Sequence, residues 1–203
     1  MPFSLPGQLT IEKTPSYYVT SDTPERIKRM SRDVKLLLVV RDPVTRAVSD
    51  YVQAKLRRPD LASFEDLAFT NSSFTEVNTS WGGIRVSLYS RYIDQWLLHF
   101  PRDQLLFLSG EDLIRQPGDV MLRVQRFLKL SEVINQQHFS FNTTKRFPCL
   151  LKPKDNGRAH CLTNGKGRTH PEVDERALTA LRRFFQPFNE RFFSKIGQRF
   201  EWD

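Results

Sequence analysis

Apolar runs of strand length alternate with amphipathic stretches of helical spacing along most of this chain. Residues 35–40 and 105–108 are such runs, and we expect both to be fully buried strands. A short strand at 9–11 and an extended segment at 15–19 are also expected. Helices are predicted at 23–30, 64–69, 83–100, 112–116, 119–128 and 174–197, the last bent or interrupted at Pro187. This alternation indicates an α/β fold with a parallel sheet, in which ligands gather at the carboxyl ends of the strands.

The junction after the first predicted strand has the features of an anion site. Arg41 ends the apolar run, and Asp42 with Pro43 supplies an N-cap and a first helical residue. Ser49 follows about two helical turns beyond the cap, so its hydroxyl and the Arg41 guanidinium are predicted to converge on one phosphate beside the helix amides. Arg46, in the first turn, is expected to add positive charge.

The composition limits the class of binding partner but does not identify one partner. The chain has 203 residues, 39% of them hydrophobic, which is enough for one sizeable core, so we expect a single domain over residues 1–203. The formal net charge of +8 favours a polyanionic partner such as nucleic acid, an anionic membrane or a sulfated glycan. The sequence contains neither an apolar run of about 20 residues nor the apolar core of a signal peptide, so no targeting segment is expected within it.

Cysteine and asparagine positions favour an oxidising, secretory environment for the parent protein. Cys149 and Cys161 enclose a short polar loop, which favours a disulfide. Zinc remains the alternative, because His160 and His170 lie near these cysteines, although the spacing matches no usual finger or ribbon. Acceptor sequons for N-glycosylation begin at Asn71, Asn78 and Asn142.

The order of strand, Arg-x-Pro, helix and Ser resembles the 3′-phosphate-binding motif of sulfotransferases that use 3′-phosphoadenosine 5′-phosphosulfate (PAPS). Further blocks resemble heparan sulfate glucosamine 3-O-sulfotransferases, and they occur in that family's order. They lie at residues 11–17, 79–81, 139–142, 147–149, 166–171 and 201–203. The resemblance covers essentially the whole chain.

The resemblance implies a P-loop-NTPase-like sulfotransferase fold with a central parallel sheet flanked by helices. It also implies transfer of a sulfuryl group from PAPS, as co-substrate and without a metal, to the 3-hydroxyl of glucosamine in heparan sulfate. Cations and amides near the sulfate would stabilise the charge that develops in this in-line transfer, as in phosphoryl transfer. The implied enzyme is a monomer of the Golgi lumen, with a type II membrane anchor that this sequence does not contain.

The same resemblance assigns roles to individual residues. Arg41 and Ser49 would bind the 3′-phosphate, and Lys13 would lie near the sulfuryl group and the acceptor sugar as a catalytic residue. The nucleotide would be wrapped by Lys166, Gly167, Arg168, Thr169 and His170. The acceptor side would be formed by Lys13, Thr14, Pro15, Ser16, Gln53, Arg57 and Trp81. Arg57 stands where related isoforms carry lysine, a difference that would retune the choice of sulfated saccharide.

Ordinary structural roles compete with several of these assignments. Arg41 could pair with the adjacent aspartate at the surface, and a helical serine such as Ser49 commonly bonds back to a carbonyl. Taken by itself, Lys13 is an ordinary solvated surface lysine, and residues 166–170 are an ordinary basic loop. Tryptophan side chains such as that of Trp81 lie more often in protein cores than on sugar-binding surfaces.

One departure from the family concerns the donor loop. The resemblance places a Lys- and Gly-rich loop for the 5′-phosphosulfate, and then the catalytic glutamate, ahead of the matching region, and neither occurs before Glu12. We therefore expect residues 1–203 to be the carboxyl-terminal three quarters of a catalytic domain and to transfer little sulfate alone. The alternative is a catalytically silent heparan sulfate-binding protein that uses Lys13, Arg57, Lys166 and Arg168. A nucleic-acid role is disfavoured, because no helix-turn-helix, zinc finger or RNP pattern accompanies the charge.

Overall fold

The computed structural model describes residues 5, 7–144, 146–152, 157–162 and 170–202. The α-helices are α1 (Thr23–Met30), α2 (Pro43–Arg57), α3 (Phe64–Ala68), α4 (Gly82–Ser87), α5 (Ile93–His99), α6 (Gly110–Arg115), α7 (Pro117–Phe127) and α8 (Glu175–Ile196). The short 3-10 helices are η1 (Pro15–Val19), η2 (Tyr89–Arg91), η3 (Arg102–Gln104) and η4 (Gln136–His138). The strands are β1 (Leu36–Val40), β2 (Leu105–Ser109), β3 (Phe139–Asn142), β4 (Phe147–Leu151) and β5 (Ala159–His160).

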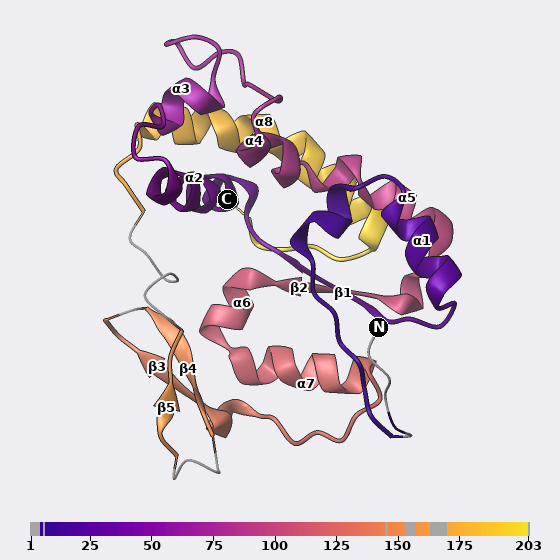
Figure 1. The fold of residues 1–203 in the computed structure, drawn as a ribbon. Helices are drawn as coiled ribbons and strands as arrows, with labels where there is room; N and C mark the ends of the chain where they lie inside the picture. Colours follow the sequence, from indigo (N-terminus) through magenta and orange to yellow (C-terminus); the bar gives the residue numbers. More distant parts are fainter. Residues whose placement is uncertain (1–4, 6, 145, 153–156, 163–169, 203) are drawn as a thin grey trace.

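A parallel pair of strands lies between two groups of helices. β1 and β2 run parallel, in a register that places Val40 opposite Ser109, so their carboxyl ends lie side by side. Figure 1 shows α1, α4, α5 and α8 on one side of this pair and α6 and α7 on the other. The predicted α/β class with a parallel sheet is confirmed.

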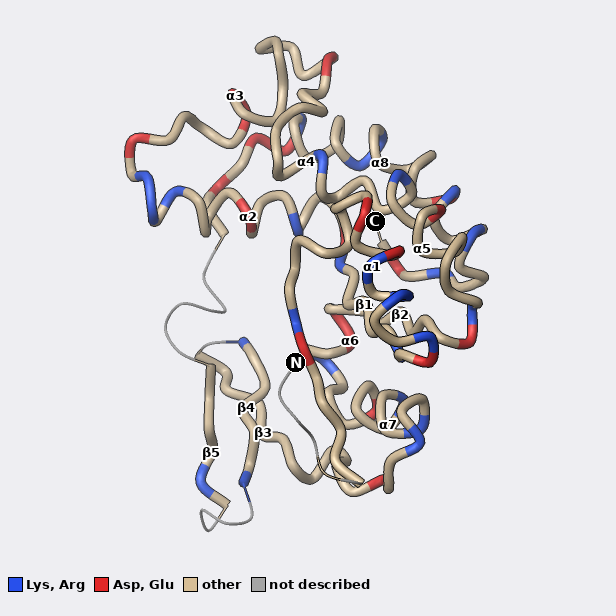
Figure 2. The backbone as a smooth tube through the Cα atoms, turned by 45° about the vertical axis from the view of Figure 1, so that its right-hand side comes forward, with Lys and Arg blue, Asp and Glu red and all other residues tan. Residues whose placement is uncertain are grey.

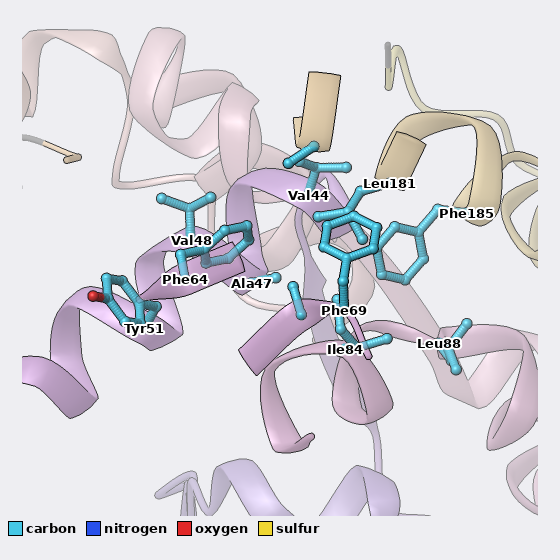
Figure 3. Close-up of a cluster of buried hydrophobic side chains, with 12 residues drawn as sticks. Val44, Ala47, Val48, Tyr51, Phe64, Phe69, Ile84, Leu88, Leu181 and Phe185 are labelled. Carbon is cyan, nitrogen blue, oxygen red and sulfur yellow. The ribbon is translucent and has the colours of Figure 1, made fainter. Parts of the chain in front are cut away.

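Two apolar clusters stabilise this arrangement. The first joins α2, α3, α4 and α8, and Figure 3 shows Leu181 and Phe185 of α8 beside Phe69 and Ile84. The second packs against β1 and β2 and contains Val40, Ile93, Trp96, Phe100, Phe107 and Phe192. Helix α8 contributes to both clusters, so it connects the region around α2 to the parallel strands.

The predicted continuous helix over residues 83–100 is wrong, because the chain forms α4, η2 and α5 instead. The break falls at Leu88, whose ψ of 67° is not helical. Leu88 packs into the first cluster, whereas Tyr89 and Trp96 pack into the second. A single straight helix could not bury both sets of side chains, and burial of apolar area outweighs the lost helical hydrogen bonds.

Four other expectations differ from the structure. Residues 9–11 form no strand, and 15–19 form the 3-10 helix η1 rather than an extended segment. β1 is not fully buried, since alternate side chains leave Leu37 39% and Val39 52% exposed. Of the two alternatives at Pro187, the interruption is wrong: helix α8 continues through this residue, because buried phenylalanines on both sides anchor it to the two clusters and offset the lost hydrogen bond.

A second sheet, antiparallel and in the order β3-β4-β5, was not predicted from the sequence. It lies apart from the parallel strands in Figure 1, and its β4 carries Cys149. Cys149 and Cys161 form a disulfide, which confirms the predicted bridge and leaves neither sulfur as a free thiolate for zinc. Of the helices in the described ranges, none is long and apolar enough to cross a membrane.

Candidate functional site

The site begins at the sharp turn from β1 into α2. Val40, the last residue of β1, is fully buried and fixes the position of the backbone that follows. Asp42 caps α2, with its Oδ1 accepting a hydrogen bond from the Thr45 N–H at 2.7 Å, and Pro43 is the first helical residue. The predicted cap is therefore confirmed, and Arg41 lies between β1 and the capped helix.

Three polar side chains meet at this turn. Arg41 Nη1 donates to Ser49 Oγ at 2.9 Å, as the sequence spacing predicts for these two residues. His170 Nε2 lies 2.9 Å from the same hydroxyl, although it is 121 residues further along the chain. A guanidinium, a hydroxyl and an imidazole thus converge from β1, α2 and the segment that precedes α8.

The environment of His170 favours its neutral form. Partial burial lowers the pKa of His170 below its usual value, and the nearby positive charge of Arg41 lowers it further. Because Ser49 Oγ accepts a hydrogen bond from Arg41, the hydroxyl proton is available to Nε2 of the neutral ring. An anion placed between Arg41 and His170 would reverse this effect and favour the imidazolium.

A rigid frame holds the backbone of Arg41. The Tyr89 hydroxyl accepts from the Arg41 N–H at 3.2 Å and donates to the Arg41 carbonyl at 3.0 Å. Glu111 Oε1 accepts from the Asp42 N–H at 3.0 Å and lies 3.6 Å from Arg41 Nε. A Cβ on Gly110 would come within 3.1 Å of the Val40 carbonyl oxygen, so a glycine permits this close approach of the two strand ends.

A small cavity of about 140 Å³ opens beside this frame. Val44, Val48 and Leu178 form its apolar wall, and Thr45 and His170 contribute polar atoms. His170 lines this cavity and also contacts Ser49, so the apolar wall lies next to the cluster that contains the Arg41 guanidinium. This arrangement suits a ligand that carries both a ring and a phosphate.

Comparison with known proteins identifies the family. Residues 11–198 match the family model described as "Sulfotransferase domain". The chain belongs to the sulfotransferase family.

This sulfotransferase chain has close relatives among curated proteins. It is 51% identical over its full length to "Heparan sulfate glucosamine 3-O-sulfotransferase 3B1" of Homo sapiens and covers 52% of that protein. It is 49% identical to "Heparan sulfate glucosamine 3-O-sulfotransferase 6" of Mus musculus, covering 59% of it, and 41% identical to the human protein numbered 5, again covering 59%. The chain thus spans between half and three fifths of these relatives.

A solved structure supports the fold. A sulfotransferase from Alicyclobacillus acidocaldarius aligns with 91% of this chain and 63% of its own, with a TM-score of 0.63 and 21% sequence identity. At that identity the likeness establishes the shared sulfotransferase fold, and the predicted fold class is confirmed.

Arg46 of the sulfotransferase does not join the cluster, which corrects the expectation that it adds charge there. Its Nη1 donates to the Gly83 carbonyl at 3.0 Å and to Ser87 Oγ at 2.9 Å, and its Nη2 pairs with Asp50 at 3.0 Å. Arg46 therefore connects α2 to α4, and these acceptors satisfy a guanidinium that is largely buried.

The predicted acceptor residues fall into two groups. Gln53 and Arg57 follow Ser49 at intervals of four residues, so all three lie on one face of α2. Lys13 is exposed in the segment before η1, and Thr14 donates to Glu12 Oε1 at 2.6 Å. Pro15 and Ser16 begin η1. The segment that precedes η1 passes the parallel strands in both Figure 1 and Figure 2.

Trp81 makes core contacts. Its ring packs edge-on against Phe64, with centroids 5.6 Å apart, and a Cβ on Gly83 would come within 2.5 Å of the indole. The side chain belongs to the periphery of the first cluster and keeps partial exposure. A role as a glycan platform stays a prediction for the exposed part.

Four predicted nucleotide-binding residues, Lys166, Gly167, Arg168 and Thr169, lie outside the described residues.

Sequence reasoning missed the residues that frame Arg41. Glu111 follows β2 immediately after Gly110, at the carboxyl end of a predicted strand, so the rule on ligand positions in parallel sheets could have found it. Tyr89 gave no such signal, because it falls inside the stretch predicted as one amphipathic helix.

Proposed function

We propose that this sulfotransferase transfers a sulfuryl group from PAPS to the 3-hydroxyl of glucosamine units in heparan sulfate. The observation that carries the proposal is the convergence of Arg41, Ser49 and His170 at the carboxyl end of β1. The relatives that match the full chain at 41% to 51% identity are named for this reaction. We assign Arg41 and Ser49 to the 3′-phosphate of the donor.

The chemistry of this donor set suits a phosphate. A guanidinium and a hydroxyl both donate to phosphate oxygens, and an imidazole becomes a further donor once it is protonated. Asp42 already accepts from the Thr45 N–H at the start of α2, so that amide is engaged, and we assign the contact chiefly to the side chains. A share for the other amides of the first turn stays a prediction.

The transfer itself needs stabilised charge and a base. The acceptor oxygen forms a bond to sulfur, the bond from sulfur to the 5′-phosphate oxygen breaks, and the hydroxyl proton passes to a base. Adenosine 3′,5′-bisphosphate leaves. We assign Lys13 to stabilising the sulfuryl oxygens, on the basis of its sequence context and its exposed side chain. The nucleotide is further enclosed, in this proposal, by Lys166, Gly167, Arg168, Thr169 and His170.

Heparan sulfate is the proposed acceptor, and its chain would lie along the face of α2 that carries Gln53 and Arg57. The net charge of +8 supports a sulfated polyanion as the partner. Figure 2 shows blue segments on several elements, among them α2, α7 and α8. Thr14, Pro15, Ser16 and the exposed part of Trp81 complete the proposed acceptor side. We propose one domain that acts as a monomer.

The disulfide supports an oxidising compartment, and we propose the Golgi lumen. Asn71 is the sequon best placed for glycosylation, since the residue is exposed and its amide donates to an exposed hydroxyl, Thr75 Oγ1, at 2.9 Å. In contrast, the Asn78 amide donates to the Leu67 carbonyl at 3.0 Å, and Asn142 lies within β3. Asn78 and Asn142 are therefore the less accessible of the proposed acceptors.

Transfer of labelled sulfate tests the proposal. The protein is incubated with labelled PAPS and heparan sulfate, and the digested product is mapped by position. Because residues 1–203 are expected to transfer little sulfate alone, we expect weak transfer, with the label at the glucosamine 3-hydroxyl. Arg41→Ala should weaken transfer about 100-fold further at limiting PAPS, because a charge-assisted contact to phosphate is lost. Arg58→Ala, an exposed arginine just after α2, is the matched control and should retain activity. Label at another position would contradict the proposal, and heparin binding without transfer would favour a silent binding protein.

A further inference from the structure

We propose that Glu111 is a positioning residue for Arg41: its carboxylate fixes the guanidinium in the orientation that receives the 3′-phosphate. The inference rests on the proposed function, since it assumes that Arg41 binds that phosphate. Glu111 lies in the first turn of α6, directly after β2, and belongs to none of the sequence motifs described above.

The Glu111 carboxylate connects three parts of the two strand ends. Oε1 accepts from the Asp42 N–H at 3.0 Å and lies 3.6 Å from Arg41 Nε. Oε2 accepts from Ser109 Oγ at 3.2 Å, and that same Ser109 oxygen accepts from the Asp112 N–H at 3.0 Å to cap α6. The carboxylate is thus tied to the end of β2 and reaches across to the end of β1.

The guanidinium needs such a partner. Arg41 Nε is buried and, within the described part of the chain, has no hydrogen-bond partner, so the nearby carboxylate is what balances it. The side chains of Arg41 and Glu111 are 33% and 27% exposed, which leaves the pair only partly screened by water. With Nε held towards Glu111, the opposite edge of the guanidinium presents Nη1 to Ser49.

Apart from Ser49, which accepts from Nη1 at the side to be occupied by the phosphate, the neighbours that frame Arg41 act on its backbone. Tyr89 bonds the Arg41 N–H and carbonyl, and Gly110 allows the strand ends to approach. These contacts place the Cα of Arg41 but leave the side-chain torsions open. Among the described residues, Glu111 is the carboxylate that pairs with the Arg41 side chain, and its effect on phosphate binding therefore passes through that arginine.

Two substitutions separate orientation from charge. Glu111→Gln keeps an oxygen at the Oε1 position, and its amide can donate to Ser109 Oγ, so the geometry is retained while the negative charge is removed. We expect this variant to bind the 3′-phosphate at least as tightly as the wild type. Glu111→Ala removes both oxygens, and we expect about a 10-fold loss of the 3′-phosphate contribution, in line with coupling energies between contacting residues.

The test compares dissociation constants for adenosine 3′,5′-bisphosphate and adenosine 5′-monophosphate, measured by titration calorimetry. Their ratio isolates the contribution of the 3′-phosphate. We expect the ratio to fall about 10-fold in Glu111→Ala and to be retained in Glu111→Gln. In an Arg41→Ala background, Glu111→Ala should cause no further fall. Asp112→Ala, on the same helix but paired with Arg115, is the matched control and should leave the ratio unchanged.

Three outcomes would overturn the inference. One is an unchanged ratio in Glu111→Ala, and another is an equal loss of affinity for both nucleotides, which would show a general structural role. The third is an additive effect of Glu111→Ala on Arg41→Ala. If Glu111→Ala does not fold, Glu111→Asp serves instead, because it keeps the charge but shortens the side chain. A ratio of dissociation constants in Glu111→Asp equal to that of the wild type also overturns the inference. A wild-type ratio in Arg41→Ala itself would refute the proposed function, and with it this inference.

Discussion

Replacing Tyr89 by phenylalanine tests the frame that holds Arg41. The substitution removes one hydroxyl and keeps the ring, whose contacts with Phe192 and Trp202 have centroid separations of 5.5 and 5.7 Å. Both backbone groups of Arg41 then lose a partner, since the hydroxyl accepts from the N–H at 3.2 Å and donates to the carbonyl at 3.0 Å.

The magnitude follows from these two hydrogen bonds. A buried polar group that loses its partner costs about 1–3 kcal/mol, so two such groups predict a loss of about 2–6 kcal/mol in the free energy of unfolding. No cavity term is added, because the phenyl ring fills the same space. Burial raises the pKa of Tyr89 to about 12, so the hydroxyl keeps its proton, and its donor role, at neutral pH.

Urea unfolding of wild type and variant, at equal m-values, measures this loss. Tyr92→Phe is the matched control, because its hydroxyl makes one exposed hydrogen bond, to the Arg85 carbonyl at 3.1 Å. We expect the control to lose about 0.5 kcal/mol. Equal losses in Tyr89→Phe and Tyr92→Phe would refute the reasoning that the Tyr89 hydroxyl holds the site.

Three further predictions concern the imidazole, the disulfide and the first cluster. Burial, and then Arg41, lower the pKa of His170, and a bound phosphate should raise it. Adenosine 3′,5′-bisphosphate should therefore bind with proton uptake by the imidazole at a pH between the pKa of the free protein and that of the complex. Calorimetry in two buffers should show more proton uptake in wild type than in His170→Asn, and equal uptake would contradict the role of the imidazole. Replacing both Cys149 and Cys161 by serine should lower the free energy of unfolding by about 3 kcal/mol, because the disulfide restricts the unfolded chain. An unchanged midpoint in urea unfolding would contradict this reasoning. Phe185 is 1% exposed, so Phe185→Ala should lower the free energy of unfolding by about 3–5 kcal/mol. Phe141 is 56% exposed, so Phe141→Ala should lower it by less than about 1 kcal/mol. Similar losses in the two variants would contradict the assigned core.

The turn from β1 into α2 could be predicted because its determinants are local. The apolar run, the Asp42 cap and Pro43 are adjacent in the sequence. Arg41 and Ser49 are eight positions apart, and most of the chain between them is the first part of α2, whose geometry is fixed. Any chain with this local order would bring the two side chains to one side of the turn.

The remaining structure depends on partners that are distant in sequence. Whether Leu37 and Val39 are covered depends on which helices reach that face, which an apolar run cannot reveal. The break at Leu88 reflects competition between two clusters. The contacts of Glu111 and Tyr89 with the turn join residues 69 and 48 positions apart, and a single sequence carries no record of such pairing.

The most direct test of the central claim is the contribution of the 3′-phosphate to nucleotide affinity, measured with adenosine 3′,5′-bisphosphate and adenosine 5′-monophosphate. We predict that the bisphosphate binds about 100-fold more tightly to the wild type and that Arg41→Ala removes most of this difference, because a charge-assisted pair contributes about 2–3 kcal/mol. Arg58→Ala should leave the difference intact. Equal affinities for the two nucleotides in the wild type, or a full difference in Arg41→Ala, would contradict the assignment of this turn as the 3′-phosphate site.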